Sequence, residues 1–414
     1  MENLPIFASP IYQQELEQSI QVDLNPYGAD LKNGPIEFNI VGNDDLIDLS
    51  ATTLHIKAKI TKHDGTSYDE KAEVAFINNT LHSLFSDVIV TINDTIIEGT
   101  EHQYSMKAMI GTLFSYGEQT MTKQLFSSGF SKDDAGKLDD VTNKGYVDRK
   151  TRALKGASQD FYGKLFVDLF QQNKYMIGNV NMRIKLIRAS SSYAIWCNMA
   201  NERPKVVIES AKLYVRKVRL NLPILGNIAM SLSKGGVVHY PINRTEIYTI
   251  PAPAGRLDIV RDQLFYGKVP KLIVMTMVDS EAIDGVYAKN PYNFKHCNIK
   301  YLDLRIDGES KPILPLTPDF KNKLCLREYM SLLEAMNIVG KDACLPISYE
   351  EFLNGYTFFA WNTTSDYALR AQNPAMRRNI RLDLKFSEAT TASVNILLYC
   401  IFDSTVMIDG SGNV

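Results

Sequence analysis

The second half of the 414-residue chain repeats the order of the strand patterns in its first half, about 200 residues later. Residues 180–189 read VNMRIKLIRA and residues 380–389 read IRLDLKFSEA. Both segments alternate apolar with polar side chains, which in a strand point to opposite faces of a sheet. Each segment is therefore predicted to be a half-buried β-strand.

The correspondence continues on both sides of these two segments. Each half has an alternating run broken by Asn-Asp or Asp-Gly, residues that tolerate the positive φ of a tight hairpin. A short helical pattern follows each hairpin, and a long strand closes each half. These paired elements are the hairpins at 86–99 and 298–312, the helical patterns at Tyr104–Phe114 and Tyr329–Met336, and the strands at 206–220 and 393–409. Two copies of one β domain explain this order.

Length and strand number define the expected architecture. A chain of 414 residues exceeds the roughly 250–300 residues at which one hydrophobic core stops growing. We predict an all-β double jelly roll, with two eight-stranded antiparallel β-sandwiches in tandem and short helices in the loops. The expected parts are an N-terminal arm at 1–34, a first jelly roll at 35–221, a linker at 222–236 and a second jelly roll at 237–414.

Residues 116–160 form the longest segment without clear periodicity, and they are rich in Gly, Ser, Asp and Lys. Such a segment inside a compact domain is usually a functional or partner-contacting excursion, and we expect an exposed loop. Its basic residues Arg149, Lys150 and Arg152 are candidate subunit contacts, to phosphate or to an acidic loop of a neighbour. A solvated loop face with mixed charges is the favoured alternative.

The expected N-terminal arm has a weak amphipathic pattern. Its apolar residues Ile11, Leu16, Ile20 and Leu24 recur every four or five positions, so the arm is a candidate contact to an adjacent subunit or an internal layer. A frayed terminus is the alternative.

Charge and composition limit the possible partners. The formal net charge of −2 argues against a protein that condenses nucleic acid, so any DNA contact is expected to be non-specific. No run approaches the ~18 apolar residues of a membrane span. The five cysteines are odd in number and far apart, which favours reduced thiols over a disulfide framework.

The residue patterns do not predict catalysis or a metal site. The six histidines make no His-Glu-x-x-His spacing, and the adjacent pair His296 and Cys297 would point to opposite faces of a strand. The acidic cluster Asp44, Asp45 and Asp48 could hold Ca²⁺, although a polar turn is the simpler interpretation. The sequence has no nucleophile elbow and no phosphate-binding or dinucleotide-binding glycine motif. We expect a protein that is not an enzyme and needs no cofactor.

Several segments, in order along the chain, resemble the major capsid protein of Polinton (Maverick) elements and adintoviruses. They are GPIEFNIVGNDDLIDLSATTLHIKAKITKHDG (34–65), LHSLFSDVIVTINDTII (81–97), AKLYVRKVRL (211–220), KNPYNFKHCNIKYLDLRIDGE (289–309) and IFDSTVMIDGSGNV (401–414). The resemblance implies a double jelly-roll capsid protein of the lineage that includes adenovirus hexons and virophage capsids. It implies pseudo-hexagonal homotrimers, the capsomers of an icosahedral shell around a DNA genome.

The resemblance also implies partners and a location. The chain would bind itself, then neighbouring capsomers, and penton or minor capsid proteins. It would reside in the virion capsid after synthesis and assembly inside the host cell, in the cytoplasm or the nucleus.

Two other classes of function stay open. Jelly rolls also host carbohydrate-binding and hydrolytic proteins, but a glycosidase needs two converging carboxylates and the sequence nominates no such pair. A domesticated or minor capsid component, such as a penton, is the other alternative, although a penton normally needs only one jelly roll.

Overall fold

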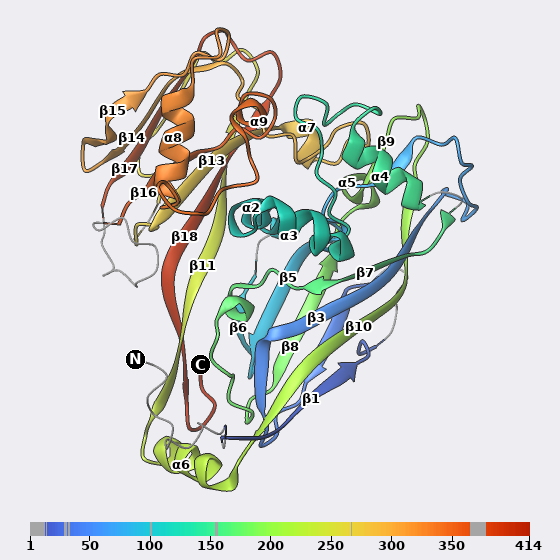
Figure 1. Cartoon of the computed structure of the whole chain (residues 1–414), viewed down its shortest axis with the longest axis vertical. Helices are drawn as coiled ribbons and strands as arrows, with labels where there is room; N and C mark the ends of the chain where they lie inside the picture. Colours follow the sequence, from blue (N-terminus) through green and yellow to red (C-terminus); the bar gives the residue numbers. More distant parts are fainter. Residues whose placement is uncertain are drawn as a thin grey trace, which may run out of the picture.

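The computed structural model describes residues 13, 15–28, 31, 34–99, 102–153, 156–265, 267–364 and 378–414. Over these residues the chain forms four four-stranded sheets and one two-stranded sheet, and every strand pairing is antiparallel. The sheets make two β-sandwiches in tandem, here called the first roll and the second roll (Figure 1). The predicted all-β class and the two eight-stranded sandwiches are confirmed.

The first roll consists of two four-stranded sheets and one small sheet. One sheet has the order β1 (Leu16–Leu24), β10 (Lys205–Leu220), β3 (Leu46–Thr61) and β7 (Gln159–Lys164). The other has the order β2 (Ile36–Ile40), β8 (Met182–Arg188), β5 (Phe85–Ile92) and β6 (Thr95–Glu98). The small sheet pairs β4 (Val74–Phe76) with β9 (Ile195–Cys197).

The second roll repeats this arrangement. One sheet has the order β11 (Val237–Ala252), β18 (Val394–Asp409), β13 (Leu272–Asp279) and β16 (Phe359–Asn362). The other has the order β12 (Asp258–Arg261), β17 (Ile380–Phe386), β14 (Ile299–Ile306) and β15 (Glu309–Leu316). The alternating segments at 180–189 and 380–389 supply β8 and β17, which occupy the same position in equivalent sheets. The sequence repeat is therefore a repeat of three-dimensional topology.

Short helices lie in the connections. They are α1 (Thr80–Ser83), α2 (Tyr104–Ser115), α3 (Glu118–Lys123), η1 (Leu125–Ser128), α4 (Lys144–Ala153), η3 (Asp168–Gln171), α5 (Ser191–Ala194), α6 (Leu222–Ser233), α7 (Ser280–Ile283), α8 (Leu326–Ala335) and α9 (Tyr349–Leu353). In the described part of the chain, no helix has both the length and the apolar character needed to cross a bilayer. Helices α2 and α8 each follow the equivalent hairpin of their roll, as the sequence predicts.

Each roll contributes side chains to the hydrophobic core of the other roll. The core of the first roll includes Tyr240 and Ile408, from the ends of β11 and β18 near α6. The core of the second roll includes Ile110 from α2. In Figure 1, β11 and β18 extend from the second roll along the side of the first and end beside α6. Side chains of each roll are thus removed from water by the other.

The expectation that residues 116–160 form an exposed loop is wrong. The segment contains α3, η1 and α4 and the beginning of β7. Phe130, Leu138 and Tyr146 are each 4% exposed or less and belong to the core that is centred on the second roll. The segment is ordered by contacts with distant residues, and a local pattern cannot reveal such contacts.

Part of the expected N-terminal arm is an edge strand of the first roll. Residues 16–24 form β1, which pairs with β10 from Leu16 opposite Leu220 to Leu24 opposite Leu213. A spacing of four residues also places side chains on one face of a strand, because the strand period of two divides four. Ile11 lies outside the described residues.

Candidate functional site

The segment at 116–160 connects the two rolls through a set of polar contacts. Asp139 accepts hydrogen bonds from the backbone nitrogen of Asn290 at 2.6 Å and from the side-chain amide of Asn293 at 2.8 Å. The hydroxyl of Tyr356 donates to the backbone oxygen of Asp133 at 3.1 Å. The partners of Asp139 and Asp133 in these bonds lie in the second roll, so this segment fixes one roll against the other.

Arg149 anchors this segment from inside the protein. Its guanidinium donates to the backbone oxygens of Phe76 and Ser131 at 3.0 and 3.2 Å and pairs with Asp133 at 2.9 Å. The side chain is only 4% exposed. Burial raises the pKa of Asp133, although the nearby Arg149 charge acts in the opposite direction. Its donors are thus used within the chain, and contact of Arg149 with another subunit stays a prediction.

The other two basic candidates lie on the more accessible side of α4. Lys150 and Arg152 are both partly exposed. Arg152 donates to the hydroxyl of Ser131 at 2.6 Å, and its guanidinium lies 4.2 Å from the ring centre of Phe126. Burial lowers the pKa of Arg152. Contact of Lys150 or Arg152 with another subunit stays a prediction.

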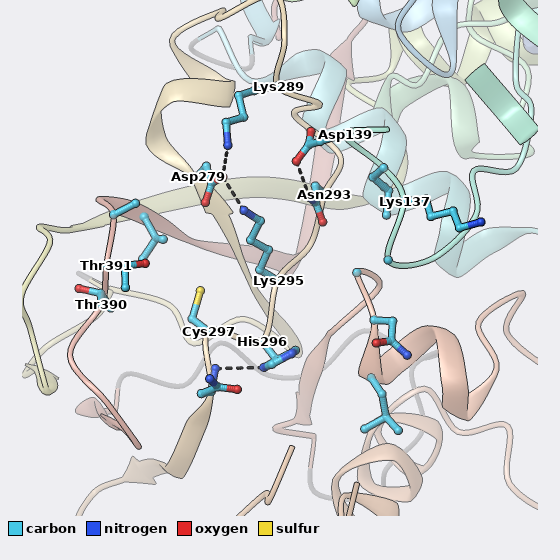
Figure 2. Close-up of a pocket in the computed structure, with 18 of the residues that line it drawn as sticks. Lys137, Asp139, Asp279, Lys289, Asn293, Lys295, His296, Cys297, Thr390 and Thr391 are labelled. Atoms are coloured by element: carbon cyan, nitrogen blue, oxygen red, sulfur yellow. Dashed lines mark hydrogen bonds and ion pairs between the residues drawn. The ribbon is translucent and has the colours of Figure 1, made fainter. Parts of the chain in front are cut away.

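A polar cavity of about 730 Å³ opens where the tip of the 116–160 segment meets loops of the second roll (Figure 2). Its size falls in the range of small-molecule sites. In the view of Figure 2, Lys289 and Lys295 both point toward Asp279, and the nitrogen-to-oxygen distances are 3.5 and 2.5 Å. Asp139 and Asn293 form a second hydrogen-bonded pair beside this group. Since these charged and polar groups satisfy one another, we assign the cavity no ligand.

His296 and Cys297 line the same cavity but do not form a metal site. The His296 ring stacks on Phe320 with ring centres 4.2 Å apart, and its Nδ1 accepts a hydrogen bond from the backbone of Asn298. Burial lowers the pKa of His296 and raises the pKa of Cys297 to about 11, so the thiolate is disfavoured at neutral pH. Within the described ranges, no three or more His, Cys, Asp or Glu side chains are grouped to hold a metal ion.

The acidic cluster near residue 45 has arginine partners. Asp45 accepts a hydrogen bond from Arg219 at 3.0 Å, and Asp48 lies 3.7 Å from Arg216. The five cysteines are free thiols, and three of them, Cys197, Cys325 and Cys400, are buried.

A buried ionic group lies at the junction of the two rolls. The Lys107 amine lies 2.6 Å from a carboxylate oxygen of Glu98 and 2.9 Å from one of Asp168, and the three side chains are exposed by 1%, 9% and 5%. The same Asp168 oxygen accepts the backbone N–H of Thr245, in β11 of the second roll, at 2.7 Å. One cation thus organises two carboxylates where the rolls meet.

The buried ionic group also changes proton affinities. Burial raises the pKa of Glu98 to about 7, with Lys107 lowering it and Asp168 raising it further. For Lys107, burial alone would lower the pKa, but attraction to the two carboxylates outweighs burial and the pKa is raised. Our sequence reasoning missed this group. A possible signal is the single lysine within the apolar helical pattern YSMKAMIGTLF at 104–114.

Comparison with protein-family models gives no match. The chain is 22% identical over 415 residues to the "Uncharacterized protein F54H12.2" of Caenorhabditis elegans, an alignment that covers 97% of each chain.

Solved structures are similar over nearly all of the chain. A chain of the cryo-EM structure of the Sputnik virophage matches with a TM-score of 0.66 and 11% identity, over 99% of this chain and 90% of that chain. The Faustovirus major capsid protein matches at 0.58 and 9% identity, over 99% and 93%. The mavirus major capsid protein matches at 0.57 and 11% identity, over 100% and 92%. These similarities, with the repeated strand order, show that the chain has the double jelly-roll fold.

Proposed function

We propose that the protein is a structural subunit of a viral capsid. The observation that carries this proposal is the match of its whole double jelly-roll fold to structures described as major capsid proteins, those of mavirus and Faustovirus. The resemblance of segments such as 34–65 and 289–309 to the Polinton and adintovirus major capsid protein supports the finer assignment to that lineage. A structural role also fits the junction between the rolls, where polar groups satisfy each other.

The proposed assembly unit is a homotrimer with a pseudo-hexagonal outline. Three chains with two similar rolls each supply six similar wedges, and head-to-tail contacts between such wedges close into a ring. Capsomers of this kind would then bind one another and minor or penton proteins. They would form an icosahedral shell around a DNA genome, inside the host cell.

Solution mass and negative-stain imaging test this proposal. We expect purified wild-type protein to have three times the chain mass of 46.7 kDa and to show hexagonal outlines. A monomer that persists at high protein concentration would contradict it. A hydrolase screen is expected to be negative, and turnover that survives repurification would also count against a purely structural role.

A further inference from the structure

The equivalent helices of the two rolls differ greatly in burial. In α2, ten of the twelve residues are buried, whereas in α8 only three of the ten residues are buried. Both helices follow the same hairpin of their roll, β5–β6 for α2 and β14–β15 for α8. Another part of the chain therefore covers α2 of the first roll, and no part of the chain that the structure describes covers α8 to the same extent.

Strand β11 of the second roll covers this flank of the first roll. The Gln103 side chain, at the beginning of α2, donates to Thr249 of β11 at 3.3 Å. The backbone N–H of Thr245 donates a hydrogen bond to the buried carboxylate of Asp168. The Tyr240 hydroxyl accepts a hydrogen bond from the backbone N–H of Ile177 at 2.9 Å. Strand β11 is the edge of its sheet, and β1 holds the same edge position in the first roll. The contact between the rolls thus joins the β11 edge to a flank made by α2 and η3, beside the end of β6.

The equivalent flank of the second roll is exposed and apolar. The guanidinium of Arg327, in α8, donates to the backbone oxygens of Leu314 and Pro315 of β15 at 2.7 and 2.9 Å, so strand and helix form one continuous surface. The exposed apolar residues of β15, of α8 and of the turn before α8, here called the β15–α8 patch, are Ile313 (91%), Leu314 (67%), Leu324 (68%), Leu326 (62%) and Met330 (39%). Exposed apolar residues gathered at a sheet edge are typical of protein interfaces.

We propose that the β1 edge of a second copy of this chain covers the β15–α8 patch, as β11 covers the flank of the first roll within one chain. This inference rests on the proposed function and names the surfaces that would close the trimer. Each roll would then meet the next in the same manner, three times within chains and three times between them.

Charge supports β1 as the occupant. Strand β1 reads LEQSIQVDL, which includes Glu17 and Asp23 and no basic residue, and Asp23 also lies 3.3 Å from Lys212 of the adjacent strand β10. Residues 311–327 carry four cations and one carboxylate, namely Lys311, Lys321, Lys323, Arg327 and Asp319. Opposite charges around an apolar centre favour encounter and fix the register of an interface. Ile20 of β1, one of the subunit contacts that the sequence suggests, is 37% exposed.

The positions of the two surfaces favour a ring. In Figure 1, β1 lies at the lower right of the first roll and β15 at the upper left of the second, on opposite flanks of the chain. One chain therefore cannot bring its own β1 to its own β15–α8 patch. Contacts between two different surfaces are head-to-tail. Such contacts close into a ring when the rotation from one copy to the next is a whole-number fraction of a full turn.

Substitution of the patch tests the inference. At a concentration where wild type is trimeric, Leu314→Asp and Leu326→Asp are expected to lower the solution mass threefold, to 46.7 kDa. Met230→Asp is the matched control, because Met230 is also an exposed apolar helix residue (55%) but belongs to α6. The control is expected to stay trimeric and to keep the thermal unfolding midpoint of wild type. The two patch variants should still unfold in one cooperative transition, at a lower midpoint because they lose the stabilisation that association gives.

Cross-linking of the wild-type oligomer gives a second test that needs no variant to fold. A zero-length carbodiimide reagent should join Glu17 or Asp23 to Lys311, Lys321 or Lys323 between isotopically labelled and unlabelled chains. Trimers in wild type and in both patch variants, or wild-type trimers without these cross-links, would overturn the inference and leave the proposed function intact. A monomeric wild type would overturn both.

Discussion

Lys107 shows how one residue can determine the junction between the two rolls. Its amine pairs with both Glu98 and Asp168 in a site that is almost closed to water. Asp168 in turn accepts a hydrogen bond from the backbone N–H of Thr245. A buried carboxylate without a counter-charge is costly, because the low-dielectric interior replaces its hydration poorly. The Lys107 cation is therefore needed for stability as long as Glu98 and Asp168 both stay buried as carboxylates.

Replacing Lys107 should strongly destabilise the protein. We expect Lys107→Met to lower the free energy of unfolding by about 3–5 kcal/mol, since it leaves two carboxylates buried without their partner. The control is Lys59→Met, because Lys59 pairs with Glu209 at 2.9 Å while both side chains stay about one-third exposed. That change should cost less than about 1 kcal/mol. Urea unfolding measures both, and equal losses would contradict the assigned role of Lys107.

The raised pKa of Glu98 predicts a particular dependence of stability on pH. Its pKa is about 7 in the folded chain, whereas an unperturbed Glu has a pKa of 4.5. Between these values the folded state binds more protons than the unfolded state, so this group makes stability fall as pH rises from about 4.5 to 7. Urea midpoints at several pH values should show this fall in wild type and less of it in Glu98→Gln. Identical pH profiles for the two proteins would contradict the assignment.

At the scale of elements, local patterns predicted most of the strands. The alternation at 180–189 and 380–389 identified β8 and β17, and the Asn-Asp and Asp-Gly pairs identified both hairpins. These signals are local, because side-chain direction and turn conformation depend on near neighbours in sequence. The spacing in β1 was ambiguous, since four residues suit one face of either a helix or a strand.

The segment at 116–160 could not be predicted in the same way. Its order comes from Asp139 meeting Asn290 and from Asp133 meeting Tyr356, partners that are 151 and 223 positions apart in sequence. The burial of Arg149 depends on the same packing. The composition of the segment indicates a loop, and only the arrangement of both rolls reveals that it connects them.

Removing Asp139 should loosen this connection locally. Asp139→Ala deletes two hydrogen bonds to the second roll, and we expect hydrogen exchange at the amide of Asn290 to accelerate roughly tenfold or more. The neighbouring variant Asp140→Ala is the control, because exposed Asp140 accepts a hydrogen bond only two residues away, from Thr142. Equal protection of Asn290 in both variants would show that Asp139 does not fasten the rolls.

At the scale of the whole molecule, the duplication gives one chain two similar rolls with different surroundings. The flank of the first roll is covered within the chain, and the equivalent flank of the second roll exposes the β15–α8 patch. The sequence repeat and the resemblance predicted the two rolls. They did not predict which flank stays open, because that depends on how the rolls pack together.

A cryo-EM reconstruction of the wild-type oligomer in solution is the most direct test of the proposed assembly. We predict three chains and six β-sandwiches around one axis, with β1 of each chain against the β15–α8 patch of the next. A monomer, a dimer, or a ring in which the β15–α8 patch faces solvent would contradict this assembly.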